Sequence, residues 1–150
     1  MMNPRIENMP QRLLIGINME MSLANNRTAT LWQTFMLQRG KIKNSVAAEH
    51  ISMQVYGDHT GALFIPLLTF TKWATAEVSD IPSKMDSYTL TEGLYAVFIH
   101  KGPASDFART MQEIFEQWLP NSEYALDDRE HFEILPEGYQ PMDPQAQKEV

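Results

Sequence analysis

The chain has 150 residues, which suffices for one domain that buries roughly 70% of the surface of its unfolded chain. Its net charge is −7 and its Lys and Arg residues are scattered, which argues against a nucleic-acid-binding surface because such surfaces cluster basic side chains. Cysteine is absent, which excludes disulfides, zinc–thiolate sites and cysteine nucleophiles.

The hydropathy of the chain also argues against a membrane protein. No apolar run approaches the roughly 20 residues that a membrane-spanning helix needs. Residues 1–10 lack the apolar centre of a signal peptide. We therefore expect a cytoplasmic protein that inserts into no membrane and binds no nucleic acid directly.

The first regular element that we expect is a strand. Residues 1–9 are polar and predict a loose N-terminal segment. Residues 12–21 are rich in aliphatic side chains and predict a strand, in which Gly16 indicates a bulge or the close approach of another backbone. The chain should therefore enter its first sheet near residue 12.

An amphipathic helix should follow this strand. Apolar side chains recur at helical spacing between Leu31 and Met36. Thr28 or Thr30 can cap the N-terminal end, because a hydroxyl oxygen can accept a hydrogen bond from a free backbone amide. Gly40 suits the C-terminal end.

A β-hairpin completes the first half of the chain. Residues 51–56 alternate apolar and polar side chains, as a half-buried strand does. Residues 57–61 are typical of a turn, so residues 67–78 should pair with the preceding strand. Residues 80–87 then form a boundary, and the first half runs strand, helix, strand, strand.

The clearest periodicities lie between Gly93 and Pro120. Residues 94–100 are an apolar run rich in aromatic and β-branched side chains, and they predict one buried strand. Gly93 precedes this strand and a turn at residues 101–103 follows it. The strand should therefore pass directly into the next element.

That element is a second amphipathic helix. Ser105 or Asp106 can cap its start, and Leu119 and Pro120 close it because proline lacks the next amide hydrogen. Its apolar side chains form one stripe that should pack on the sheet. They are Phe107, Met111, Ile114, Phe115 and Trp118.

The second half repeats the order of the first without residue-level identity. Residues 131–135 predict a short strand, and another strand begins at residues 148–150. We expect an α+β fold with a single domain over residues 1–150. In it, β-α-β-β modules of about 11–79 and 88–150 form one antiparallel sheet with two helices on one face and a groove between them. Ligands tend to bind in such grooves.

Four segments of the chain resemble the gyrase-inhibitor-like small-molecule-binding domain. This family also supplies the effector-binding domains of AraC-type and MerR-type multidrug regulators. The order and spacing of the segments carry the resemblance from Leu13 to Val150, and it implies the duplicated arrangement described above. The segments are Trp73–Val78, Gly93–Gly102, Trp118–Pro120 and Phe132–Pro136.

The resemblance places the family's buried acidic residue at Glu133. Burial of a carboxylate is costly unless a cation or hydrogen-bond donors compensate it. An organic cation with apolar bulk would compensate it, and aromatic faces would add cation–π attraction of about 0.5–2 kcal/mol each. The alternative is that Glu133 faces solvent on an edge strand. Candidate aromatic residues are Trp73, Tyr95 and Trp32, with Tyr88 at the rim.

Several other patterns favour a structural interpretation. Most aromatic residues at helical spacing should pack in the core: Trp32, Phe35, Phe107, Phe115 and Trp118. The four histidines show no metal-ligand spacing, and the acidic run at residues 127–131 lacks the spacing of a calcium loop. No phosphate-binding loop or Gly-x-Ser-x-Gly motif occurs. We therefore expect no metal and no cofactor.

Three functions follow from these observations. The first is a binding domain for a lipophilic, often cationic, small molecule, with Glu133 as the counter-charge and a function related to transcription regulation. The second is a small-molecule hydrolase in which Glu133 is the base or nucleophile and Tyr95 donates a hydrogen bond. The third is inhibition of a topoisomerase through an acidic surface that imitates DNA, with a protein as the partner.

Overall fold

The computed structural model describes residues 4–46, 48–56, 68–80, 85–103, 106–124, 130–137, 139 and 147–149. Three of the predicted features lie outside these residues. They are the turn at residues 57–61, the cap at Ser105 and most of the acidic run at residues 127–131.

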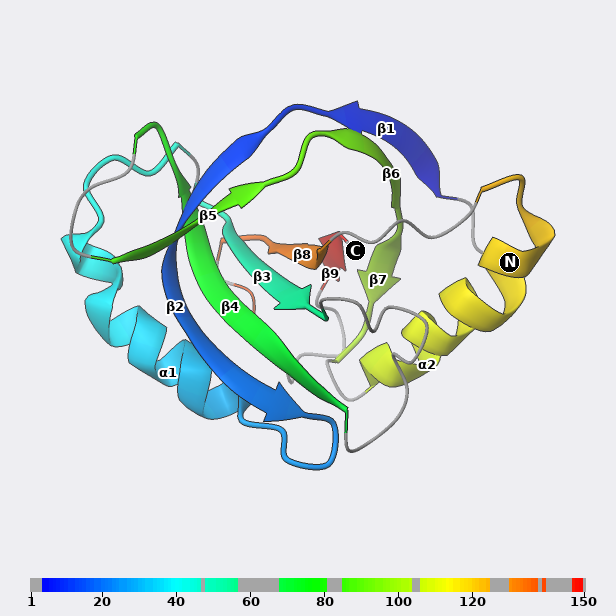
Figure 1. Cartoon of the computed structure of the whole chain (residues 1–150), viewed down its shortest axis with the longest axis horizontal. Helices are drawn as coiled ribbons and strands as arrows, with labels where there is room; N and C mark the ends of the chain where they lie inside the picture. The colour runs from blue at the N-terminus through cyan, green and yellow to red at the C-terminus, as the bar shows by residue number, and fades with distance from the viewer. Residues whose placement is uncertain are drawn as a thin grey trace.

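The described residues form two sheets and two α-helices (Figure 1). In chain order, the elements are β1 Arg5–Met9, β2 Arg12–Ser22, α1 Thr28–Gln38, β3 His50–Val55, β4 Thr69–Val78, β5 Asp86–Leu90, β6 Gly93–Val97, β7 Ile99–Lys101, α2 Phe107–Glu113, β8 His131–Leu135 and β9 Gln147–Glu149. A seven-stranded antiparallel sheet has the order β5-β2-β4-β3-β8-β9-β7, and β1 pairs with β6 in a separate ribbon. The predicted α+β fold with one large antiparallel sheet and two helices is confirmed.

The first half of the fold contains a closely packed core. β2 and β4 pair along their length, and α1 buries Leu31 and Phe35 against Ala74 and Ala76 of β4. A Cβ atom at Gly16 would collide with the carbonyl group of Ala74, whose carbon would lie 2.9 Å away. The close backbone approach predicted at Gly16 is therefore confirmed, and it explains why this position has no side chain.

Both helices cover the same face of the large sheet. The strand register places Ala74, Ser52 and Glu133 side by side, so their side chains point to one face. α1 packs over Ala74. The ammonium group of Lys148, which is paired with Glu133, lies 3.8 Å from the ring centre of Phe107 in α2. Figure 1 shows the two helices on opposite sides of the view, with strands between them.

The prediction of one buried strand over residues 94–100 is wrong in two respects. The first is that the chain passes from the β1–β6 ribbon to the large sheet at Phe98. β6 pairs with β1, whereas β7 pairs with β9. The run is also not buried throughout, since Leu94 is 49% exposed and Ile99 is 54% exposed. The prediction of a loose segment at residues 1–9 is wrong for Arg5–Met9, because β6 supplies a pairing partner that local composition does not reveal.

The helix caps and the second helix also differ from expectation. Arg27 occupies the N-cap of α1 and makes no side-chain cap bond, while the amide of Thr28 donates to Oδ1 of Asn26 at 3.0 Å. Asp106 makes no cap bond to α2, because its carboxylate pairs with Arg109 at 3.1 Å. Neither a threonine cap on α1 nor an aspartate cap on α2 is therefore present.

The stretch after α2 winds differently from a regular α-helix. A π-helical turn spans Ile114–Trp118, and a 3-10 turn spans Leu119–Asn121. Ile114 is the buried residue of α2 and this π-turn. The predicted apolar stripe is therefore only partly packed against the sheet, because a π-turn rotates the side chains that follow it. None of the helices described in the chain is long and apolar enough to span a membrane.

Candidate ligand-binding cavity

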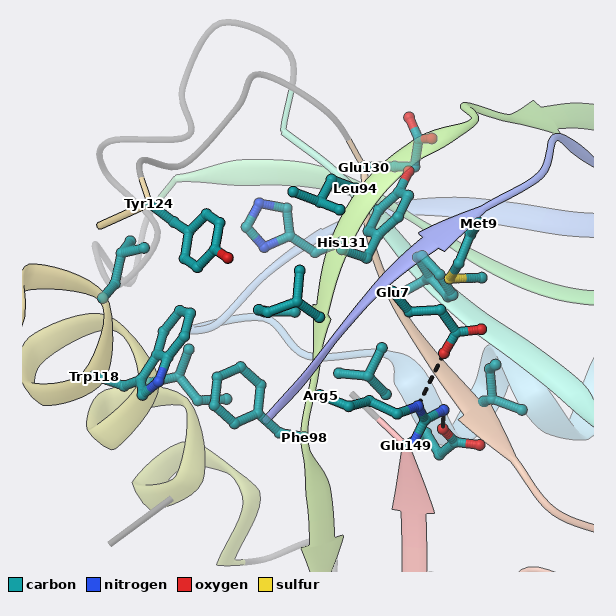
Figure 2. Close-up of a pocket in the computed structure, with 18 of the residues that line it drawn as sticks. Arg5, Glu7, Met9, Leu94, Phe98, Trp118, Tyr124, Glu130, His131 and Glu149 are labelled. Carbon is teal, nitrogen blue, oxygen red and sulfur yellow. Dashed lines mark hydrogen bonds and ion pairs between the residues drawn. The ribbon is translucent and has the colours of Figure 1, made fainter. Parts of the chain in front are cut away.

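A cavity of about 710 Å³ lies between the β1–β6 ribbon, the helical stretch that begins with α2, and β8 (Figure 2). This volume lies within the range of about 300–1,000 Å³ that is typical of small-molecule sites. No residue of α1 lines it. The second half of the chain and the N-terminal strand supply most of its lining, to which Arg12 of β2 and Glu49 are added.

The cavity exists because the strands of the second half diverge. β8 pairs with β9 at the single position Ile134 with Glu149. β6 leaves the large sheet to pair with β1, and the π-turn directs Phe115 and Trp118 toward the space between them. Neither strand pairing nor helix packing fills this space, so the side chains around it form the walls of the cavity.

Aromatic rings form most of the walls. The rings of Phe98 and Trp118 meet edge to face with centres 5.1 Å apart, and Trp118 stacks on Tyr124 at 6.2 Å. Tyr95 meets Phe132 edge to face at 5.3 Å. Such contacts hold the rings in place before a ligand arrives.

His131 contributes a polar group to the wall. Its ring stacks on Phe115 at 5.8 Å, and no described residue bonds its buried Nε2 atom. Burial lowers the pKa of His131, and the negative charge of Glu130 opposes this shift. A neutral imidazole therefore faces the aromatic cavity at neutral pH.

The basic residues of the lining are already paired. Arg5 forms ion pairs with Glu7, at 2.9 Å, and with Glu149, as Figure 2 shows. These bonds raise the pKa of Arg5. Arg12 pairs with Glu77 at 3.5 Å. The guanidinium groups are thus held at one side of the cavity by carboxylates.

Glu130 is a buried carboxylate in the lining, with only 7% of its surface exposed. Its Oε1 accepts a hydrogen bond from the amide of Thr91 at 2.7 Å, and its Oε2 accepts one from the hydroxyl of Tyr88 at 3.0 Å. Tyr95 donates to the carbonyl oxygen of Thr91 at 2.7 Å. Burial, and then the charge of Glu130, raise the pKa of Tyr88 to about 12, so its hydroxyl stays a donor at neutral pH.

Glu133 is also buried, at 5% exposed, but it faces the helix-covered side of the sheet. Its Oε1 lies 2.6 Å from Nζ of Lys148, which is equally buried. Desolvation lowers the pKa of nearby Lys72. The negative charge of Glu133 opposes this shift, and the positive charge of Lys148 lowers the pKa further. Phe132 and Ile134, its neighbours along the strand, line the cavity instead.

The aromatic residues predicted to bind a ligand lie in different parts of the structure. Tyr95 lines the cavity, and Tyr88 lies behind the wall with Trp73 packed against it, ring centres 5.5 Å apart. Trp32 belongs to α1 and packs against His50, with ring centres 5.9 Å apart. It is not part of the cavity lining. The binding roles assigned to these residues and to Glu133 stay predictions.

Sequence reasoning missed several lining residues. Phe115 and Trp118 were expected in the core, yet both line the cavity. Glu130 belongs to the acidic run at residues 127–131, to which no binding role was assigned. A signal for it was present, since Glu130, Phe132 and Ile134 follow the two-residue repeat of a strand and so share one side. Within the described ranges, no group of three or more His, Asp and Glu side chains could hold a metal ion.

Comparison with known proteins identifies the family. The model of the GyrI-like small-molecule-binding domain matches residues 2–150. The chain belongs to this family. No curated protein sequence matches the chain.

Solved structures of GyrI-like proteins share this fold at low identity. SAV2435, solved bound to tetraphenylphosphonium, has a TM-score of 0.73 at 17% identity, over 99% of this chain and 92% of that one. A protein from Staphylococcus aureus MU50 gives a TM-score of 0.71 at 17% identity, over 99% of this chain and 95% of that one. The C-terminal domain of EcmrR gives 0.69 at 13% identity, over 99% and 94%. At these identities, the similarity establishes the fold.

Proposed function

We propose that the chain binds a lipophilic small molecule, with organic cations as the preferred class, in the cavity between the β1–β6 ribbon, the helical stretch and β8. The observation that carries this proposal is the cavity of about 710 Å³ with six described aromatic side chains in its lining. Burial of apolar ligand surface is worth roughly 25 cal/mol per Å², so an aromatic site of this kind can bind hydrophobic molecules without many polar contacts.

The charges of the lining favour a cation over an anion. Among the described lining residues there are four glutamates and two arginines. Both arginines are engaged with carboxylates, so neither guanidinium is free to attract an anion. Aromatic faces attract cations further through their negative π-surfaces.

Relatives support the same class of ligand. Tetraphenylphosphonium, the molecule bound to SAV2435, is a lipophilic cation. The C-terminal domain of EcmrR belongs to a protein that was also solved in complex with DNA. We propose that this chain likewise recognises an effector molecule, in a role related to transcription regulation.

A cavity-filling substitution tests this proposal. Ala96 of β6 lines the cavity, whereas Ala29 of α1 is exposed and does not. Ala96→Phe should weaken binding of tetraphenylphosphonium at least about tenfold in calorimetry, because the new ring occupies the ligand volume. Ala29→Phe should leave the affinity unchanged. Equal affinity of the Ala96→Phe variant and the wild type, or no binding by the wild type, would contradict the proposal.

A further inference from the structure

We propose that Glu130 recognises the positive charge of the ligand and that Glu133 does not. This inference rests on the proposed function, since it names the residue that sets ligand charge in the same cavity. The two carboxylates lie three positions apart in the sequence. Glu130 comes just before β8 and lines the cavity, whereas Glu133 lies within β8 and faces the side of the sheet that the helices cover.

No ion pair within the described part of the chain neutralises the charge of Glu130. Both of its oxygens accept hydrogen bonds from neutral groups, the amide of Thr91 and the hydroxyl of Tyr88. No Lys, Arg or His side chain among the described residues forms an ion pair with it. Neutral donors stabilise a buried carboxylate without removing its net charge, so the carboxylate can still attract an organic cation in the cavity.

The other carboxylates of the lining are poorer candidates. Glu7 and Glu149 share the guanidinium group of Arg5. Glu49 is exposed, so water and salt screen its charge. Figure 2 shows Glu130 well apart from the group of Arg5, Glu7 and Glu149. The positive charge of Arg5 therefore does not cancel the negative potential of Glu130 in the cavity.

Glu133 is neutralised inside the protein. Its ion pair with Lys148 is short and buried, with side-chain exposures of 6% and 5%. A ligand cation would have to displace the ammonium group of Lys148 and leave it buried without a partner, which is costly. The charge of Glu133 therefore holds β9 beside β8 and is not available to a ligand.

The hydrogen bonds around Glu130 also fix its position. Thr91 and Tyr88 lie about 40 positions earlier in the chain and hold the carboxylate from two sides. The hydroxyl of Tyr95 bonds the same residue, Thr91, while its ring borders the cavity. A ligand with one delocalised positive charge inside an aromatic shell fits this arrangement, and a lipophilic anion does not.

Three probes of similar shape separate charge from hydrophobicity. Tetraphenylphosphonium and tetraphenylborate have nearly the same size and opposite charges, and triphenylphosphine oxide is neutral. Calorimetric affinities are measured for the wild type, Glu130→Gln and the control Glu20→Gln, whose exposed carboxylate on β2 lies outside the cavity lining. We expect Glu130→Gln to weaken tetraphenylphosphonium at least about tenfold, to leave triphenylphosphine oxide within about threefold and to improve tetraphenylborate. Glu20→Gln should change none of them by more than about threefold.

Two further variants keep the test decisive if Glu130→Gln folds poorly. Tyr88→Phe removes one hydrogen bond and keeps the charge, so the preference for phosphonium over borate should persist. The double variant Glu133→Leu/Lys148→Met removes the neutralised pair and should keep that preference as well.

The outcomes distinguish the two proposals. If no probe binds the wild type, the proposed function fails. If all three probes bind but Glu130→Gln weakens them equally, the proposed function stands and the role of Glu130 is overturned. Loss of the phosphonium preference in the Glu133→Leu/Lys148→Met variant, with Glu130 intact, would assign the charge to Glu133 and would likewise overturn it.

Discussion

The two halves of this molecule both have a helix between strands, but their interiors differ. In the first half, residues 12–78, β2 and β4 have 11 and 10 residues, and α1 buries Leu31 and Phe35 completely. In the second half, residues 93–149, the strands have three to five residues. Its helix buries only Ile114 in the stretch from residue 107 to residue 118.

Their buried polar groups differ in the same way. The first half buries small neutral groups, of which Thr75 donates to the carbonyl oxygen of Ile51 at 2.8 Å. The second half buries ionisable side chains, namely His100, Glu130, Glu133 and Lys148. The comparison indicates that the first half stabilises the fold through apolar packing. The second half is less closely packed and contains the cavity and the buried charges.

The largest effect should come from breaking the buried ion pair of the second half. Glu133→Gln leaves the ammonium group of Lys148 buried and unpaired, which should lower the free energy of unfolding by about 3–5 kcal/mol in chemical denaturation. Ser52 lies opposite Glu133 on β3, and Ser52→Ala should cost about 1 kcal/mol or less.

The double variant sharpens this comparison. Glu133→Leu/Lys148→Met removes both charges and should recover most of the loss, because no buried charge is then left unpaired. A Glu133→Gln variant that is no less stable than Ser52→Ala would show that the pair contributes nothing to the second half.

A matched leucine truncation in each half should give the next largest difference. Leu31→Ala leaves a cavity in the closely packed first half and should cost about 2–5 kcal/mol. Leu94 borders the ligand cavity and is 49% exposed, so Leu94→Ala should cost less than about 1 kcal/mol. Equal losses in thermal or chemical unfolding would remove the contrast in packing.

The smallest expected effect is a loss of stability in mild acid. Burial lowers the pKa of His50, with Arg39 adding to the shift, and burial lowers the pKa of His131. The unfolded chain therefore takes up protons below about pH 6.5 that the folded chain does not, and stability falls from there as the pH decreases.

Substitutions assign this loss to the two halves. His131→Phe keeps an aromatic ring against Phe115, and it should reduce the fall in melting temperature between pH 7 and pH 5. His50→Phe should reduce it as well. A pH profile that neither substitution changes would mean that other groups cause the loss.

Local sequence pattern was sufficient where the structure is locally determined. Alternation and helical spacing predicted β2, α1 and the hairpin of β3 and β4, because long paired strands and one packed helix leave a regular apolar repeat. The backbone contact at Gly16 was predicted for the same reason, since a glycine inside an apolar strand indicates close approach.

The candidate site could not be predicted to the same extent. Its geometry depends on partners far apart in the sequence: β1 with β6, and Glu130 with Thr91. The family resemblance directed attention to Glu133, and nothing in the sequence revealed that Lys148 neutralises it. Long-range contacts decide that Glu133 pairs with Lys148 and that Glu130 bonds Tyr88 and Thr91, and periodicity does not record these partners.

One structure determination tests the central claim most directly, namely that a lipophilic cation binds in the cavity beside Glu130. Crystals of the protein with tetraphenylarsonium would locate the arsenic atom by its anomalous scattering. Our account predicts an arsenic peak inside the cavity, among the rings of Trp118, Tyr95 and Phe132, and closer to the carboxylate of Glu130 than to that of Glu133. A peak between the two helices beside Glu133 and Lys148 would contradict it.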